Sequence, residues 1–374
     1  MAIDKVVSAS ITDSSVTSAK VAAGVLQPNF RNIVINGDMQ IAQRGTSSSG
    51  ITSDGYYTVD RFLVENGSFG TWTQSQAADA PTGQGYYNSL KMDCTTAQGS
   101  PSSNSILLVG QSIEGFMLQP IKQGTANAES TTLSFWHKHT KTGTNIVELL
   151  DADNSNAVSG SYTQSSSDTW EKATITFPAN TSGAYDNDNA RSLRIRFIMG
   201  AGTDYTSGTL ATTWQTSITN ANRYAGQVNN ADSTSNNFII TGVQYEVGTA
   251  ASDFEFLPID VNLRRCRRYY HLFVEGNNKE IGICHWYSST SMRFLGTLNP
   301  PLRTVPSLEK TSGSAYYKCY RDSGSITFDD ISLNDTYTES NFQIYATTPS
   351  TTAGQAGMFR ADNASTKIAF KAEL

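Results

Sequence analysis

Short runs of alternating apolar and polar residues constrain the fold of this chain more than any other feature. They recur from about residue 29 to residue 257 between clusters of Gly, Ser and Asn, and the clearest occupy residues 132–138, 192–198 and 238–247. Successive side chains of a strand point to opposite faces of a sheet, so each run predicts one buried and one exposed face. Many short strands joined by turns predict a β-sandwich or jelly roll.

One segment has a helical pattern instead. Pro258 ends the preceding strand pattern, and Asp260 is suited to a helix N-cap. Leu263, Cys266 and Tyr270 then share one helical face. Strand patterns return after this segment, so we expect an all-β chain with one helix. Its four predicted parts are an N-terminal extended stem over residues 1–28, a jelly-roll β-sandwich over 29–257, a connecting helix over 258–272 and a smaller C-terminal β-sandwich domain over 273–374.

The first 28 residues hold their larger apolar side chains at a spacing of five. These residues are Val6, Ile11, Val16, Val21 and Leu26. A helix would rotate them around its surface and a strand would place alternate members on opposite faces, so the spacing fits neither. It suits an extended chain that packs against copies of itself, and we interpret it as a stem that forms a homotrimer. The alternative is a chance pattern in a Ser/Ala/Val-rich tail without fixed structure.

Charge and hydropathy exclude several classes of function. Of the 374 residues only 16% are charged, and the net charge is −6, which opposes binding to nucleic-acid phosphates. No apolar run approaches the roughly 20 residues that span a bilayer. We therefore expect neither nucleic-acid binding nor membrane insertion. The N-terminal residues do not have the charged and apolar regions of a secretory signal, which predicts assembly in a cytoplasm.

The residue patterns predict no catalytic centre. Cys284 and His285 are neighbours on a strand and therefore point to opposite faces. His137 and His139 share one strand face, but the sequence supplies no third metal ligand for them. Paired carboxylates in an environment suited to glycoside cleavage are not recognisable either, so we expect no enzyme activity.

Two loops rich in Asp and Asn are the candidates for a metal site. They contain Asp151, Asp153, Asp186 and Asp188. Hard oxygen ligands of this kind suit Ca²⁺, but such sequences are also ordinary hairpin loops and lack the spacing of a helix-loop-helix calcium site. We expect a protein without a cofactor and keep calcium as the alternative.

Sugar binding has better support from the composition. The chain has 17 Tyr, 16 Phe and 5 Trp among many Asn, Ser and Thr, which supply aromatic platforms and neutral hydrogen-bond partners for a glycan. Eight aromatic residues are predicted in or near loops, where binding residues concentrate. They are Trp72, Tyr86, Tyr87, Tyr205, Trp214, Tyr287, Tyr316 and Tyr317. Packing is the simpler explanation for each one alone, and we expect one or two of the set to contact a glycan.

A series of short segments, taken in order, resembles a known family. They are NF at 29–30, NGDMQIAQRGT at 36–46, YTVDRF at 57–62, LSFW at 133–136, TWEK at 169–172, GVQYEVG at 242–248, FE at 254–255 and CRRYY at 266–270. Together they resemble bacteriophage tail-fibre and receptor-binding proteins with a jelly roll like a carbohydrate-binding module, especially those of phages of marine bacteria and cyanobacteria. The resemblance covers about residues 29–374.

This resemblance implies a non-enzymatic virion protein that adheres to a host cell-surface polysaccharide. As a hypothesis, residues 1–28 attach it to a tail adaptor, a nozzle or another virion protein. Three alternatives stay open: a capsid head-fibre or decoration protein, a tailspike-like polysaccharide depolymerase, and a non-viral carbohydrate-binding module. The last is the weakest because it should carry a secretion signal.

The predicted helix departs from this family in its arginines. Arg264, Arg265, Arg267 and Arg268 surround it, where the family more often has acidic or neutral residues. Four arginines in five positions predict that at least one meets an acidic neighbour or a partner chain. A solvated basic face is the alternative.

Overall fold

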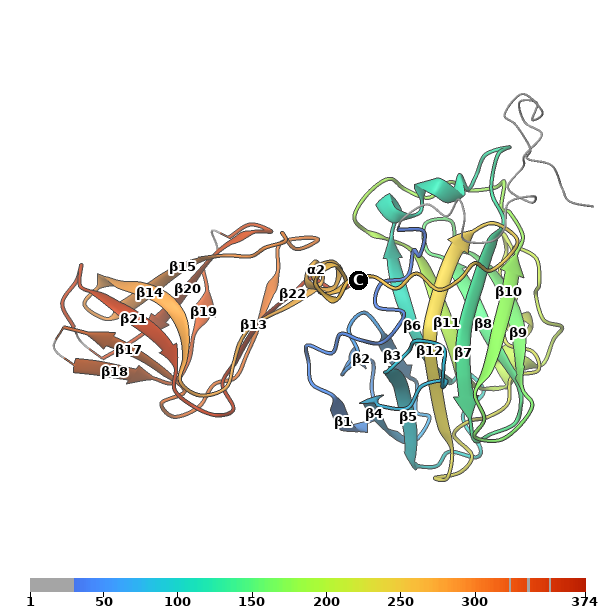
Figure 1. The fold of residues 1–374 in the computed structure, drawn as a ribbon, viewed down its shortest axis with the longest axis horizontal. Helices are drawn as coiled ribbons and strands as arrows, with labels where there is room; N and C mark the ends of the chain where they lie inside the picture. The colour runs from blue at the N-terminus through green and yellow to red at the C-terminus, as the bar shows by residue number, and fades with distance from the viewer. Residues whose placement is uncertain (1–29, 323, 335–336, 350) are drawn as a thin grey trace, which may run out of the picture.

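The computed structural model describes residues 30–349 and 351–374 except 323 and 335–336. Two β units of unequal size are joined by one helix (Figure 1), which confirms the all-β prediction. The proposed stem residues Val6, Ile11, Val16, Val21 and Leu26 lie outside the described residues.

The larger unit is a sandwich of two antiparallel six-stranded sheets. The first sheet has the order β1 (Ser47–Ile51), β4 (Thr71–Ala77), β5 (Ser89–Thr96), β12 (Asn237–Val247), β7 (Thr131–His139) and β10 (Glu171–Phe177). The second has the order β2 (Gly55–Tyr56), β3 (Leu63–Asn66), β6 (Ile106–Glu114), β11 (Arg191–Ala201), β8 (Gly143–Asp151) and β9 (Asn156–Gln164). Short helical turns lie in its connections: η3 (Gly115–Met117), η4 (Gln119–Ile121), α1 (Thr203–Thr206) and η5 (Asn220–Asn222).

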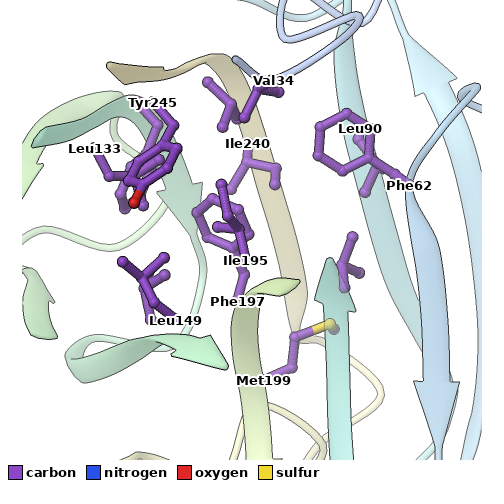
Figure 2. Close-up of a cluster of buried hydrophobic side chains, with 14 of the residues drawn as sticks. Val34, Phe62, Leu90, Leu133, Leu149, Ile195, Phe197, Met199, Ile240 and Tyr245 are labelled. Atoms are coloured by element: carbon purple, nitrogen blue, oxygen red, sulfur yellow. The ribbon is translucent and has the colours of Figure 1, made fainter. Parts of the chain in front are cut away.

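The sandwich core lies between these two sheets and follows the predicted alternation. On β11, Ile195, Phe197 and Met199 are buried between the sheets, where they meet Leu133 and Ile240 from the first sheet (Figure 2). Leu149 and Tyr245 lie in the same core. Because the strand alternates, Arg194 and Arg196 point away from this core, as predicted.

The smaller unit pairs a three-stranded sheet with a seven-stranded one. The three-stranded sheet has the order β13 (Tyr270–Glu275), β22 (Lys367–Lys371) and β16 (Ser307–Lys310). The seven-stranded sheet has the order β18 (Gly324–Phe328), β17 (Tyr317–Arg321), β21 (Ala356–Ala361), β14 (Lys279–Ser288), β15 (Ser291–Thr297), β20 (Asn341–Thr347) and β19 (Ser332–Leu333). Its core is aromatic and includes Trp286, Phe294, Phe359 and Phe370.

The connecting helix α2 (Ile259–Arg267) is shorter than the predicted range of 258–272. Its N-cap residue is Pro258, so Asp260 lies in the first turn and is not the cap. Tyr270 already belongs to strand β13, and this ends the helical pattern early. Cys266 and Tyr269 are buried against Ile35 and Ile41 of the sandwich, so the helix packs on the larger unit.

Helix α2 is also held to the sandwich through an arginine. Arg268 donates from Nε and Nη2 to the two carboxylate oxygens of Glu114, at 2.8 and 2.6 Å. This ion pair confirms that at least one helix arginine meets an acidic neighbour. Arg265 donates to the carbonyl oxygen of Asn32 at 3.3 Å, while Arg264 is exposed. The helix therefore presents only part of its basic surface to solvent.

The C-terminus of the chain is held by two arginines of the sandwich and one arginine of the smaller unit. Arg44 and Arg61 both bond the carboxylate of Glu373. Arg303 donates to the carbonyl oxygens of Ala372 and Glu373, each at 3.0 Å. The segments 36–46 and 57–62 thus fix the junction between the two β units, which accounts structurally for the charged residues they carry.

Candidate functional site

Two of the eight predicted sugar-binding residues are core residues. Trp72 on β4 is fully buried, and its indole Nε1 donates to the carbonyl oxygen of Phe69 at 2.8 Å. Tyr317 on β17 is also fully buried, and its hydroxyl donates to the carbonyl oxygen of Thr311 at 2.6 Å. The loop prediction is wrong for both, because each occupies an inward position on a strand. The alternation of inward and outward positions along each strand is the signal that could have identified them as core.

Three more of the predicted residues are partly buried and already use an aromatic face for packing. Tyr205 lies beside Tyr224, with 5.6 Å between the ring centroids. Trp214 packs against the sandwich core and donates from Nε1 to the carbonyl oxygen of Pro178 at 2.8 Å. Tyr316 packs against the core of the smaller unit. These residues therefore offer less free surface than their loop positions suggested.

Tyr86 belongs to a surface cluster that the sequence did not reveal, and the exposed Tyr87 is its neighbour in sequence. Tyr86 meets Phe254 and Phe256 at ring-centroid distances of 5.2 and 5.1 Å, and the two phenylalanines lie 4.9 Å apart. Phe256 is 48% exposed, and Tyr87, the next residue after Tyr86, is 70% exposed. We call Tyr86, Tyr87, Phe254 and Phe256 the aromatic site. Its residues come from two loops about 170 positions apart, which is why no local pattern predicted it.

A bulge in strand β12 makes room for Tyr86. Gly242 has a φ of 60°, and a Cβ atom there would lie 2.7 Å from the Tyr86 ring. The register of β12 against β7 shifts between Thr241 and Gln244, which places this glycine in the irregular stretch. Only glycine allows both this backbone conformation and the close approach of the ring.

Hydrogen bonds from β12 fix the loop that carries the two phenylalanines. The backbone N–H of Glu255 donates to Oε1 of Gln244 at 2.9 Å. The hydroxyl of Ser252 donates to Oε2 of Glu246 at 2.6 Å, and its backbone N–H donates to Oε1 of the same residue at 2.9 Å. The GVQYEVG segment therefore positions the aromatic site from beneath, so ligand contact would not have to order this loop.

The aromatic site has a neutral phenol, and the nearest carboxylate of its loop is bound by the chain itself. Burial, and next the charges of Asp38 and Asp253, raise the pKa of the Tyr86 phenol, so its hydroxyl stays neutral. The Glu255 carboxylate accepts from the backbone N–H of Phe30 and of Asn32. Neutral donors and aromatic faces of this kind suit the apolar faces and hydroxyls of a sugar.

A second cluster combines carboxylates and arginines on the outer side of β11. Arg196 donates from Nη1 to Glu148 at 3.0 Å and from Nη2 to Glu65 at 2.9 Å. Arg223 donates from Nε and Nη2 to Glu148 at 2.6 and 2.8 Å. Burial alone would raise the pKa of Glu148, but the hydrogen bonds and charges of Arg223 and Arg196 lower it below its ordinary value. A carboxylate held ionised in this way is unsuited to the proton donation that glycoside cleavage requires.

The two Asp-rich loops lie side by side, and the carboxylates of Asp151 and Asp153 bind the chain itself. Asp151 accepts from Gln123 Nε2 at 2.7 Å and from the backbone N–H groups of Asp153 and Asn154. Asp153 accepts from the backbone N–H of Asp186 at 3.0 Å. Asp151 is therefore a loop-organising residue and not an open calcium ligand. The described part of the chain contains no group of three His, Cys, Asp or Glu side chains placed to hold a metal ion.

The Asp188 carboxylate has a local role too, and the histidine pair is buried. Asp188 accepts from the backbone N–H of Ala190 at 2.9 Å. His137 and His139 both lie in the sandwich interior, where Nδ1 of His137 bonds Oε1 of Gln164 at 2.8 Å. Nε2 of His139 bonds the Tyr162 hydroxyl at 3.0 Å. These polar partners make both imidazoles structural.

Comparison with known proteins gives matches among solved structures. No protein-family model and no curated protein matches this chain. Similar solved structures include the enzymatically active domain of tailspike protein 4 of bacteriophage CBA120, at 15% identity and a TM-score of 0.30, over 58% of this chain and 22% of that chain. They also include a family 11 carbohydrate-binding module from Clostridium thermocellum, at 11% identity and a TM-score of 0.27, over 58% of this chain and 96% of that chain. A family 22 module from the same organism has 10% identity and a TM-score of 0.26, over 56% of this chain and 97% of that chain.

The known structures similar to this chain thus include a phage tailspike domain and carbohydrate-binding modules. The likeness spans about a fifth of the tailspike chain. With TM-scores below 0.5, none of these likenesses decides the function. Among the residues that the structure describes, no helix is long and apolar enough to cross a membrane.

Proposed function

We propose that this chain is a phage tail-fibre or receptor-binding protein that adheres to a glycan on the host cell surface without cleaving it. The observation that carries the proposal is the aromatic site, where Tyr87 and Phe256 are exposed on two loops that hydrogen bonds tie to strand β12, one at Asn88 and the other at Glu255. Exposed aromatic rings on a rigid support are the groups that bind sugar faces. The protein would be assembled in the host cytoplasm and act as part of the virion.

Adhesion of this kind would depend on multivalency. A single site with two exposed rings supplies a small contact area, so its affinity for a glycan is expected to be weak. Residues 1–28 would join three chains and attach them to a tail adaptor, a nozzle or another virion protein. Three linked sites then gain avidity without any new contact, because the second and third binding events are intramolecular.

A non-enzymatic role agrees with the chemistry of the carboxylate cluster. Glu148 is fully buried between Arg196 and Arg223, and Glu65 is bonded to Arg196 as well. Neither group is free to protonate a leaving oxygen or to activate a water molecule. The protein would therefore retain its receptor and not degrade it.

Glycan binding tests the proposal directly. Purified full-length protein is titrated against host surface polysaccharide by biolayer interferometry, alongside Tyr87→Ala and Phe256→Ala. Each variant should weaken binding at least 5-fold, since each removes a stacking platform. Phe116→Ala is the matched control, because Phe116 is 51% exposed on the same unit and Phe256 is 48% exposed.

Other outcomes would identify a different function. Wild-type protein that binds phage capsids but no host polysaccharide would indicate a head-fibre or decoration protein. Release of reducing sugar from the polysaccharide would indicate a depolymerase and overturn the non-enzymatic proposal. Binding that survives both substitutions would move the glycan away from the aromatic site.

A further inference from the structure

The seven-stranded sheet of the smaller unit has a large apolar surface on the side away from its core. Inward residues such as Cys284, Trp286 and Phe294 are buried, so their neighbours in sequence point outward. Six large outward side chains are between 38% and 77% exposed. They are Ile283, Tyr287, Leu295, Tyr320, Tyr345 and Met358. We call this surface the open face.

Strand register places three of these residues side by side and the others on the adjoining strands. Met358 on β21 pairs with Ile283 on β14 at one side and with Tyr320 on β17 at the other. Tyr345 on β20 pairs with Arg293 on β15. The six residues therefore spread over five neighbouring strands, β17, β21, β14, β15 and β20, which lie together at one end of the molecule (Figure 1).

The area of the open face is large for a surface in contact with water. Large side chains of roughly 150–250 Å² that are about half exposed leave about 100 Å² each, or about 600 Å² for six residues. Patches on monomeric proteins rarely exceed this size. A stable interface buries about 800 Å² on each partner, counting polar atoms as well, so these six side chains supply about three quarters of that area.

The residue types on the open face are those of a protein interface. The Arg293 guanidinium lies 4.2 Å from the Tyr287 ring centroid, and that of Arg360 lies 4.6 Å from the Tyr320 ring centroid. Lys318 pairs with Asp362 at 2.6 Å. Tyr, Met and Arg are enriched in interface cores, where acidic residues are depleted. The cations already have partners in their own chain, so the face does not call for a strongly acidic partner.

We propose that the open face is the surface at which copies of this chain meet. A second copy presents the same exposed apolar side chains, so the open faces of neighbouring copies can bury one another. The five-residue repeat of residues 1–28 independently predicts self-association. The proposal does not depend on glycan binding, because the aromatic site lies on the other β unit.

Side-chain footprinting of the purified full-length protein tests this interface. Tyr287 is 67% exposed and Tyr87 is 70% exposed, so hydroxyl radicals should oxidise the two tyrosines at equal rates in an isolated chain. If copies meet at the open face, Tyr287 should react at least 5-fold more slowly than Tyr87 at 50 µM protein. Since no other protein is in the sample, such protection comes from a second copy.

Substitutions on the open face then locate the protection. Leu295→Glu on β15 and Ile283→Glu on β14 should each restore the oxidation rate of Tyr287 to that of Tyr87. Each should also lower the mass measured by light scattering, or make that mass depend less on protein concentration. Phe116→Glu, on the sandwich, should do neither. Equal rates for Tyr287 and Tyr87 in the wild type would overturn the proposal, even if the protein is a trimer, because the stem alone would then hold it together. Protection that survives both glutamate variants would also overturn it.

Discussion

The guanidinium of Arg61 and the carboxylate of Glu373 form a buried ion pair across 312 positions of the chain. Arg61 also donates to the carbonyl oxygen of Ser112 at 2.7 Å and lies 3.4 Å from the centroid of the Tyr269 ring. One side chain of the sandwich thus contacts both the second residue after α2 and the penultimate residue of the chain. It joins the two β units more directly than any feature of the helix sequence predicted.

Arg61→Met should destabilise the protein by about 3 kcal/mol, because it leaves the Glu373 carboxylate partly unpaired in a buried site. Urea unfolding followed by circular dichroism measures the change in the free energy of unfolding. Arg264→Met is the control, since Arg264 is exposed on α2 and should cost less than about 0.5 kcal/mol. Equal effects of the two substitutions would show that the Arg61 ion pair does not hold the junction.

Stability should fall as pH falls below about 6.5. Burial, and next the charge of His137, lower the pKa of His139 well below its ordinary value, and burial likewise lowers that of His137. The unfolded chain therefore takes up protons that the folded chain does not bind. The free energy of unfolding decreases by at most about 1.4 kcal/mol per pH unit for each histidine. This decrease is absent above the pKa of about 6.5 that a histidine has in the unfolded chain.

His139→Gln should lower the number of protons taken up on unfolding by about one between pH 6.5 and pH 5, and the slope of the unfolding free energy against pH should fall accordingly. His285→Gln is the control, because His285 is exposed on the opposite side of its strand from the core. Asp60 acts in the opposite sense, since burial raises its pKa to about 6 and its contribution is lost as pH rises through that value. Asp60 titrates in both His139→Gln and His285→Gln, so its contribution cancels when the two variants are compared. A slope that His139→Gln leaves unchanged would contradict the assignment.

Gly242→Ala should disturb the aromatic site. The new methyl group would clash with the Tyr86 ring, and the left-handed backbone would add strain, for a cost of about 2–3 kcal/mol. Gly50→Ala separates the two effects, because Gly50 has a φ of 72° and open space around it. Chemical denaturation gives the two costs, and polysaccharide titration should show weaker binding only for Gly242→Ala. Wild-type affinity in that variant would argue against Tyr86 as part of the site.

Trp72→Phe should separate stability from binding. It removes the indole hydrogen bond to Phe69 and some core volume, which should cost about 2 kcal/mol. Because Trp72 is fully buried on β4, polysaccharide affinity should stay within 2-fold of the wild type under native conditions. Thermal unfolding and biolayer interferometry measure the two quantities. A large loss of affinity with little loss of stability would restore Trp72 as a binding residue.

The aromatic residues show which side-chain positions the local sequence pattern predicts and which it does not. Trp286 and Tyr287 are adjacent, and alternation alone places one inward and the other outward. Tyr86 and Phe256 are different, because their meeting depends on two loops that the bulge at Gly242 brings together. Sequence spacing describes side chains along one strand, but it does not describe which loops cover which strand.

The sequence by itself determined the all-β class, most strand positions and the place of the connecting helix, because strand and helix periodicities are local properties of the chain. The tertiary structure decided the rest. It selected the aromatic residues that stay exposed, it paired Arg61 with Glu373, and it left one face of the seven-stranded sheet open. These features depend on contacts between distant segments, whose burial and charge no local pattern specifies.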